Sequence, residues 1–271
     1  MIVDFHVHPV PSDAHIPDTF KEFVARQRQD LAELRKNYGQ PEQFLDLMDQ
    51  AGVDYAVLLA EIAAITSALV TNEEVLQFCQ ASPRLLPFAS INPYLTTNLA
   101  AVLEDLIRDG FKGLKMYPTY QYFYPNDPLV YPLYAKAQEL EVPVMFHTGS
   151  STFQGSRLKY GDPIFFDDVA VDFPELTIIM CHGGRPFWYN KAAFLARLHK
   201  NVYLEISGLP PKKLLDYFPD LERIAAKMLF GSDWYGVKTI KENIDEIRNL
   251  KINEDAKEMI LGINAALLLK L

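Results

Sequence analysis

The chain has 271 residues, of which 49% are hydrophobic and 23% charged, and its formal net charge is -9 at pH 7. This composition is typical of a globular protein with a sizeable core and excludes a largely disordered chain. The negative charge disfavours nucleic acid and anionic membrane surfaces as partners. The first residues show no signal-peptide pattern, and no apolar run approaches the ~20 residues of a membrane span, so we expect a cytoplasmic protein.

Eight short β-branched or apolar segments alternate with helical patterns along the chain. The predicted strands are residues 2–8, 53–60, 85–92, 111–118, 142–149, 176–184, 201–208 and 227–234. Amphipathic helical segments lie between most of them, and several end on glycine, a common residue just after a helix. Strand then helix, repeated over roughly 250 residues, predicts an α/β protein with one (β/α)₈ TIM-barrel domain over residues 1–271. The absence of a glycine-rich phosphate-binding motif after the first strand disfavours an open doubly wound sheet.

Two connections stand out by their length or composition. Residues 9–40 after the first strand contain TFKEFVARQRQDLAELRKNYG (19–39), which predicts a helical insertion. Because active sites of such barrels lie at the rim where the strands end, we interpret this insertion as a lid in preference to a solvent-exposed extra helix. The segment YPTYQYFYPNDP (117–128) after strand four predicts either a pocket wall or a homo-oligomer contact.

The two cysteines, Cys79 and Cys181, are too few for a disulfide framework and lack the paired spacing of a structural zinc site, so we expect reduced thiols. Cys181 precedes His182, but neighbours on a strand point to opposite faces, so the pair is not expected to form a nucleophile and its base. A buried packing role is predicted for Cys181.

His6 and His8 are two residues apart in the first predicted strand, so their side chains point to the same face, about 6.5 Å apart along the strand. One divalent ion can bridge that distance. Two histidines alone are weak support, because they are also compatible with a satisfied polar pair in the core. Further ionizable residues stand at the ends of four other predicted strands: Lys115, His147, His182 and Asp233. Unpaired polar groups in a barrel interior are costly, and a shared metal site at the rim accounts for all of them. His15 and His199 are expected at the surface.

These segments resemble the amidohydrolase superfamily, and within it the amidohydrolase-related family that includes the aminocarboxymuconate-semialdehyde decarboxylase-like enzymes. The resemblance is carried, over nearly the whole chain, by VDFHVH, GLKMYP, VMFHTGS, MCHGGRPFW, LFGSDW and ILGINAALLL. TatD-type nucleases and PHP phosphoesterases share similar first motifs, but their later motifs fit this chain less well. The resemblance implies a metal-dependent barrel enzyme, usually with zinc.

Residue by residue, the resemblance implies that His6, His8, His147 and Asp233 bind the metal. It implies that His182 either binds a second metal or acts catalytically beside the first.

Lys115 decides between these two arrangements. In two-metal members of the superfamily, a carboxylated lysine in this position bridges the ions. The alternative is an unmodified Lys115 that pairs with a carboxylate or contacts the substrate. We favour one metal, because one metal is common in the family with the closest motifs.

Two reactions fit these residues: hydrolysis of a small amide, lactone or ester, and non-oxidative decarboxylation of a small unsaturated or aromatic acid. The hydrolase is predicted here and the decarboxylase is the alternative, because the chain is shorter than typical decarboxylase members and shows no identifiable substrate-binding arginine near the first loop. For hydrolysis, Asp233 is the expected general base, and His182 stabilises the oxyanion or orients the water. A non-enzymatic scaffold is disfavoured, since it has no use for converging ionizable residues.

Three cations follow strands five and six. Arg185, directly after the His-Gly-Gly segment, is expected to bind a carboxylate-bearing small-molecule substrate. Arg157 and Lys159 are equally well explained by surface salt bridges.

Overall fold

Eight parallel strands pair in sequence order around a barrel. The structure is a computed structural model, and it describes residues 1–12, 16–27, 29–63, 69–236 and 239–271. The strands are β1 (Val3–Val7), β2 (Tyr55–Leu59), β3 (Leu85–Ser90), β4 (Gly113–Met116), β5 (Val144–His147), β6 (Ile178–Cys181), β7 (Val202–Glu205) and β8 (Met228–Leu229). Each lies within a segment predicted as a strand. The predicted TIM barrel is therefore confirmed.

Backbone hydrogen bonds between β1 and the segment after β8 bring the two ends of the sheet together. Phe5 N–H donates to the Phe230 carbonyl at 2.9 Å, and Asp233 N–H donates to the His6 carbonyl at 3.0 Å. This closure places the residues that follow β8 beside the residues that end β1.

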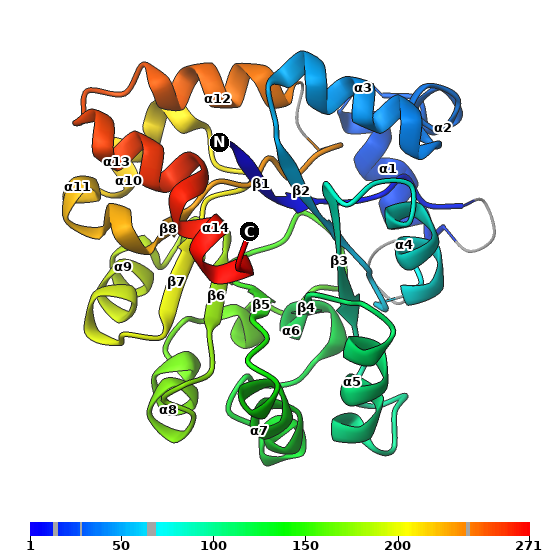
Figure 1. Cartoon of the computed structure of the whole chain (residues 1–271). Coiled ribbons are helices and arrows are strands. Elements are labelled where there is room, and N and C mark those ends of the chain that lie inside the picture. Colours follow the sequence, from blue (N-terminus) through cyan, green and yellow to red (C-terminus); the bar gives the residue numbers. More distant parts are fainter. Residues whose placement is uncertain (13–15, 28, 64–68, 237–238) are drawn as a thin grey trace.

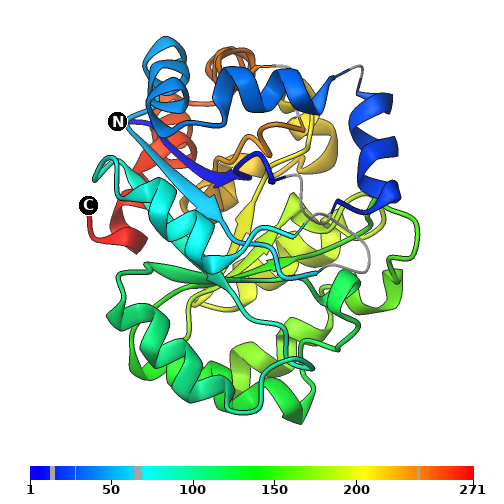
Figure 2. The ribbon, with the colours of Figure 1, turned by 90° about the vertical axis from the view of Figure 1, so that its right-hand side faces the viewer.

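The helices form a ring around the strands, as Figure 1 shows in a view that has both termini near the centre and Figure 2 shows from the side. They are α1 (Asp18–Arg26), α2 (Leu31–Tyr38), α3 (Pro41–Ala51), α4 (Asn72–Cys79), α5 (Leu99–Arg108), α6 (Pro118–Gln121), α7 (Tyr131–Glu139), α8 (Phe165–Asp172), α9 (Tyr189–Leu198), α10 (Leu214–Tyr217), α11 (Leu221–Ile224), α12 (Ile240–Arg248), α13 (Glu254–Glu258) and α14 (Asn264–Leu269). A π-helical segment, Met259–Ile263, joins α13 to α14. Among the described residues, no helix has the length and hydrophobicity needed to cross a bilayer.

Helices α1 and α2 form the predicted insertion after β1, and α3 is the helix that leads into β2. The chain begins α2 with the Asp30 carboxylate accepting from Glu33 N–H, a typical N-terminal cap. His15 lies outside the described residues. His199 is partly buried at the end of α9, where its Nε2 lies 2.7 Å from Asp167 Oδ1.

Apolar side chains fill both sides of the barrel wall. One large cluster lies between the strands and the surrounding helices. A smaller cluster fills the interior, formed by alternate residues of the strands: Val3, Phe5, Val57, Leu59, Leu86, Phe88, Met145, Ile179, Cys181 and Leu229. Gly113 makes room for this interior cluster, because a Cβ there would lie 2.4 Å from the Phe88 ring. The barrel is thus a packed core that supports a site at one end.

A β-bulge in β1 changes which side chains point inward. The register with β2 shifts between Asp4 and Val7. Phe5 packs in the interior cluster, yet His6 and His8 also face inward, while Val7 packs toward the helices. Regular alternation would have placed Phe5 and His6 on opposite faces, so the bulge lets β1 contribute both to the apolar core and to the site.

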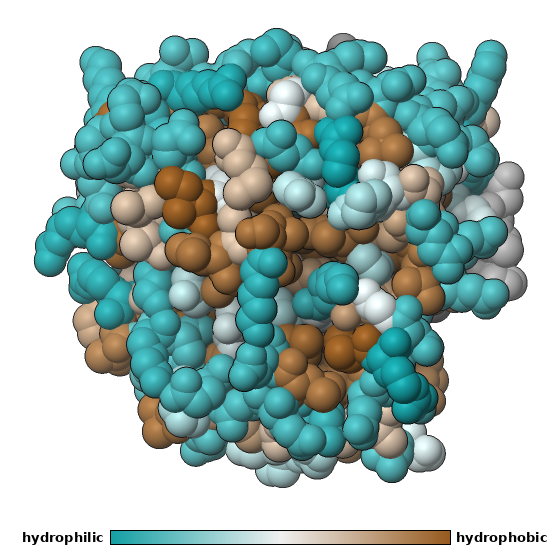
Figure 3. All heavy atoms as spheres, viewed as in Figure 1, coloured by the Kyte–Doolittle hydropathy of each residue, from teal (hydrophilic) through white to brown (hydrophobic). Residues whose placement is uncertain are grey.

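Figure 3 shows the outer surface in the view of Figure 1, where hydrophilic residues dominate and apolar residues gather toward the middle. Exposed apolar residues near the C-terminus include Leu267 and Leu271. The sequence-based expectation of a homo-oligomer stays an expectation.

Asn201 offers a test of how the end of the barrel opposite the site is held together. This buried side chain directly precedes β7. It donates from Nδ2 to the carbonyls of Phe173 at 2.9 Å and Leu176 at 3.0 Å. Asn201→Ala leaves these carbonyls without their donor and is expected to lower the free energy of unfolding by about 1–3 kcal/mol. Denaturant unfolding measures this change. Asn249→Ala, at an exposed position, is the control and should change it by less than ~0.5 kcal/mol; equal stability of both variants would contradict the prediction.

Candidate active site

A cavity of about 410 Å³ opens at the ends of the strands, on the side opposite to their amino ends. It is lined by every residue that the sequence pointed to as part of a site: His6, His8, Lys115, His147, His182, Arg185 and Asp233. These side chains come from β1, β4, β5 and the segments after β6 and β8, so only the closed barrel brings them together.

Three of these side chains form a compact set of ligand atoms. His6 Nε2 and His8 Nε2 lie 3.1 Å apart, and Asp233 Oδ1 lies 3.5 Å from the first and 3.6 Å from the second. All three atoms lie within 4.8 Å of one another. Two imidazole nitrogens and a carboxylate oxygen are a donor set that suits zinc and other divalent transition metals. The residues present therefore fit a divalent ion.

His147 and His182 form a second imidazole pair beside this set. His182 Nε2 lies 3.1 Å from His147 Nδ1. The other nitrogens face backbone carbonyls, His182 Nδ1 that of Ser207 at 3.0 Å and His147 Nε2 that of Ser150 at 3.2 Å. Because carbonyls only accept, these outer nitrogens carry the protons and the two inner nitrogens face each other as acceptors. Within the described part of the chain, the compact set around His6 does not include His147.

Two site residues have backbone conformations that are uncommon for residues other than glycine. His182, in a 3₁₀ turn after β6, has φ 62°, and Asp233 has φ 63°. Such left-handed residues cluster at functional sites, where the surrounding structure holds them. The same conformation ends the strand alternation after Cys181, so Cys181 and His182 both lie on the inner side.

The expectation that Cys181 and His182 point to opposite faces is thus wrong in its premise, because the left-handed His182 backbone turns its ring inward. The functional consequence is unchanged, since the His182 ring nitrogens contact His147 and Ser207. Both cysteines are free, and Cys181 is buried, as predicted; Cys79 is buried as well.

Two buried glutamates at the site were missed by the sequence reasoning. Glu205 ends β7, and Glu61 follows β2 and lines the cavity. Burial raises the pKa of Glu205 to about 7 and that of Glu61 to about 8, although the Lys115 charge lowers both. The available signal was a charged residue inside an apolar strand pattern, as in NVYLEISG and VLLAEIAA.

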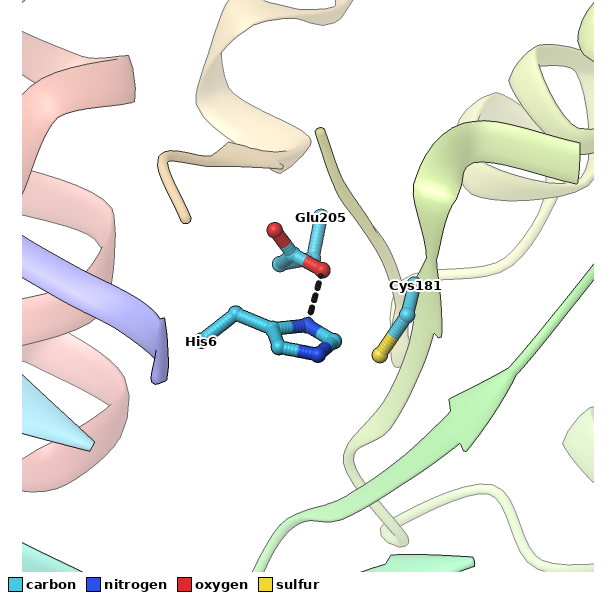
Figure 4. A group of neighbouring side chains, drawn as sticks. All are labelled: His6, Cys181 and Glu205. Atoms are coloured by element: carbon cyan, nitrogen blue, oxygen red, sulfur yellow. Dashed lines mark hydrogen bonds and ion pairs between the residues drawn. The ribbon is translucent and has the colours of Figure 1, made fainter. Parts of the chain in front are cut away.

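Lys115 is fully buried at the wall of the cavity. Its Nζ donates to Cys181 Sγ at 2.9 Å and lies 5.3 Å from the centre of the Tyr117 ring. Ligand atoms of Cys181, His6 and Glu205 also lie within 4.8 Å of one another. Figure 4 shows these three side chains as neighbours. In this second group the His6 Nδ1 is already hydrogen-bonded to Glu205 and the Lys115 ammonium faces the sulfur, so we interpret it as a support for His6 and not as a metal site.

Arg185 reaches into the cavity from the turn after β6. Its Nη1 lies 3.8 Å from Asp233 Oδ2, and its guanidinium occupies a slot above Gly208. A Cβ at Gly208 would lie 1.8 Å from that Nη1 atom. Arg157 and Lys159 instead lie over aromatic rings, Arg157 over Tyr122 at 4.5 Å, and neither is among the described residues that line the cavity.

Aromatic side chains form the outer wall of the cavity. Phe20 and Phe23 of α1 both contact Phe153, with ring centres 6.1 and 5.1 Å apart. Tyr120, from the aromatic segment after β4, contacts Phe153 at 5.9 Å and also lines the cavity. The insertion therefore covers part of the cavity, as expected of a lid, and the segment 117–128 contributes to a pocket wall.

Solved structures with the same fold have varied activities. An uncharacterized TIM-barrel protein from Bordetella bronchiseptica is 24% identical, with 99% of this chain and 98% of that chain covered and a TM-score of 0.81. A dihydroxybenzoic acid decarboxylase from Polaromonas, with bound manganese and the inhibitor 2-nitroresorcinol, is 20% identical, with 100% and 97% covered and a TM-score of 0.74. A probable 2-pyrone-4,6-dicarboxylic acid hydrolase from Acinetobacter baumannii is 18% identical, with 100% and 99% covered and a TM-score of 0.69. At these identities the likeness shows the fold alone.

The match of the chain to a family model is stronger support for its relationship than these structural similarities. The model described as Amidohydrolase matches residues 3–271, from the first strand to the last residue. The match includes every residue of the cavity described above. The chain belongs to the amidohydrolase family, and it is an enzyme of that metal-dependent superfamily.

Proposed function

We propose that this enzyme is a metal-dependent hydrolase of a small carboxylate-bearing amide, lactone or ester. The observation that carries the proposal is the Asp233 carboxylate, which contacts His6 and His8 on one side and Arg185 on the other within one cavity. This arrangement puts a base, a set of metal ligands and a substrate-binding cation within reach of one small molecule.

The proposed ligands of the metal are His6, His8 and Asp233, with His147 as the further ligand that the family resemblance implies. Zinc is the proposed ion because imidazole and carboxylate donors suit it well. When bound, such an ion supplies Lewis-acid activation of water or of a substrate carbonyl.

Asp233 is the proposed general base. Burial alone would raise its pKa, but the contact with His8 and the nearby His6, His182 and Arg185 outweigh burial and lower the pKa well below its usual value. Asp233 is therefore a carboxylate at neutral pH and is ready to accept a proton from the attacking water and pass it to the leaving group.

His182 is proposed to orient that water. Burial lowers its pKa well below the usual value, so the ring is neutral. Because Nδ1 donates to the Ser207 carbonyl, Nε2 is an acceptor at the cavity surface. An acceptor suits the role of orienting a water better than that of stabilising an oxyanion.

Arg185 is proposed to bind a carboxylate of the substrate. A guanidinium presents paired N–H donors that match the two oxygens of a carboxylate. Its contact with Asp233 at 3.8 Å is longer than a hydrogen bond, so donors remain for a ligand.

Decarboxylation of an unsaturated or aromatic acid is the second candidate. It is favoured by the aromatic wall of Phe20, Phe23, Phe153 and Tyr120 beside the histidines, which suits a planar ring. The manganese-containing decarboxylase of similar fold adds support.

The two reactions are distinguished by their products. Purified enzyme loaded with zinc or manganese is incubated with carboxylated lactones and amides and, separately, with hydroxylated benzoic acids. We expect ring opening or amide cleavage with oxygen taken from ¹⁸O-water, and an Asp233→Asn variant that keeps the fold but loses turnover by about 100-fold or more. Carbon dioxide release with no ¹⁸O in the remaining organic product would establish the decarboxylase instead, and unaltered turnover in Asp233→Asn would remove that residue from the base role.

The metal site is tested by removing the two β1 histidines together. Zinc at about 100 times its dissociation constant should stabilise the wild type by about 2.7 kcal/mol, and the His6→Ala/His8→Ala double variant by none. His199→Ala is the matched control, because this histidine pairs with Asp167 away from the cavity, and it should retain the full effect. Thermal unfolding with and without zinc measures both, and equal stabilisation of all three proteins would refute the site.

The metal count is tested at Lys115. The facing nitrogens of His147 and His182 would suit a second ion, whereas the hydrogen bond from Lys115 to Cys181 suits a free amine and a single ion. We expect one zinc per chain and an unmodified Lys115, after growth with zinc and bicarbonate, by metal analysis and intact-protein mass. Two ions with a carbamate in the electron density would overturn this expectation.

A further inference from the structure

Glu205 contacts His6 on the side that faces away from the cavity. The glutamate is fully buried, and its Oε2 lies 2.8 Å from His6 Nδ1, the contact drawn in Figure 4. Ser207 donates to the same carboxylate, from its hydroxyl at 2.8 Å and from its backbone N–H at 2.5 Å. With donors on both oxygens, the carboxylate is an acceptor, so the proton of the His6 ring lies on Nδ1.

Gly231, in the segment after β8, leaves the space in which this contact forms. A Cβ at Gly231 would lie 2.2 Å from Glu205 Oε1 and 2.7 Å from His6 Cβ. The Gly231 backbone is not in the left-handed region, so alanine is excluded by the neighbouring pair and not by its own conformation. The sequence thus keeps a slot for one particular arrangement of His6 and Glu205.

The contact has a direct consequence for the opposite side of the ring. With the proton on Nδ1, the lone pair of His6 Nε2 points to His8 Nε2 at 3.1 Å and Asp233 Oδ1 at 3.5 Å. We propose that Glu205 is a positioning residue that, in the slot left by Gly231, fixes the tautomer and orientation of His6 for metal binding. The inference rests on the metal site proposed above. A hydrogen-bonded carboxylate of this kind also makes the imidazole a stronger ligand.

Among the described residues, His8 has no carboxylate hydrogen-bonded to its ring as Glu205 is to that of His6. The two histidines can therefore be compared within one site. The His8 Nδ1 lies 3.6 Å from Glu61 Oε2, too far for a hydrogen bond. The His8 side chain is 20% exposed, against 1% for His6. Replacing Glu61 thus removes a buried carboxyl group from the site without removing a hydrogen bond to a ligand ring.

A purely electrostatic role for Glu205 makes a different prediction from a positioning role. If Glu205 only balanced the Lys115 charge, Glu205→Gln and Glu205→Ala would remove that charge equally. If it positions His6, the glutamine retains much of the effect, because its amide oxygen still accepts from Nδ1–H, whereas alanine leaves only the Ser207 hydroxyl, at 3.0 Å from Nδ1, as an acceptor.

The test measures zinc affinity by competition with a chelator. We expect Glu205→Ala to weaken zinc binding about 10- to 100-fold, and Glu205→Gln and Glu61→Ala to weaken it less than about tenfold. Gly231→Ala is expected to behave like Glu205→Ala. Asn201→Ala, which loses buried hydrogen bonds away from the site, controls for a general loss of stability and should bind zinc as the wild type does.

A second measurement reports the tautomer of the His6 ring. In metal-free protein labelled with ¹⁵N-histidine, the His6 signals should show the Nδ1–H tautomer in wild type and Glu205→Gln, and a tautomer mixture in Glu205→Ala. Wild-type zinc affinity in Glu205→Ala, or equal losses in the alanine and glutamine variants, would overturn the positioning role while leaving the metal site intact. A wild-type protein that binds no zinc would overturn the proposed site, and this inference with it.

Discussion

The closure of the barrel between β1 and the segment after β8 is the constraint on which the site depends. The bond from Asp233 N–H to the His6 carbonyl joins, in the backbone, two residues whose side chains also meet in the cavity. The Asp4 carboxylate strengthens the same junction by accepting from the backbone N–H groups of Ser232 at 2.8 Å and His6 at 3.2 Å. Loss of this junction would open the sheet and at the same time separate the proposed metal ligands. The same hydrogen bonds therefore close the barrel and hold the site together.

The burial of ionizable groups is the second constraint on the site. Carboxyl groups of Asp4, Glu61, Glu205 and Asp233 surround the histidines, whereas the cations among the described residues that line the cavity are Lys115 and Arg185. Burial raises the pKa of Asp4 to about 7, as it raises those of the glutamates, which shows the cost of keeping these charges out of water. A divalent cation among these groups would stabilise their ionised forms, and this electrostatic argument is independent of ligand geometry.

The fold was predictable because strand and helix periodicities are local properties of the sequence. The convergence of His6, His8, His182, Arg185 and Asp233 was also predictable, since residues that end parallel strands meet at one rim. The bulge in β1 and the left-handed backbones at His182 and Asp233 depend on tertiary packing and had no local signal. Glu205 did carry a local signal, a charge inside an apolar strand pattern, but its partner, His6, is 199 positions away along the chain, and no local pattern indicates that contact. Whether the reaction is hydrolysis or decarboxylation depends on the substrate, which no residue pattern names.

The outer wall of the cavity comes from a different part of the chain than its floor. Phe20 and Phe23 belong to α1, which lies in the insertion, whereas the histidines and carboxylates belong to the barrel strands and the turns that follow them. The insertion touches the barrel rim through a few bonds, such as that from Gln29 to the Tyr235 carbonyl at 3.0 Å. In evolutionary terms the two layers are separate targets of selection: α1 can exchange its aromatic residues and so change which molecules enter, while the reactive groups and the core beneath them stay constant.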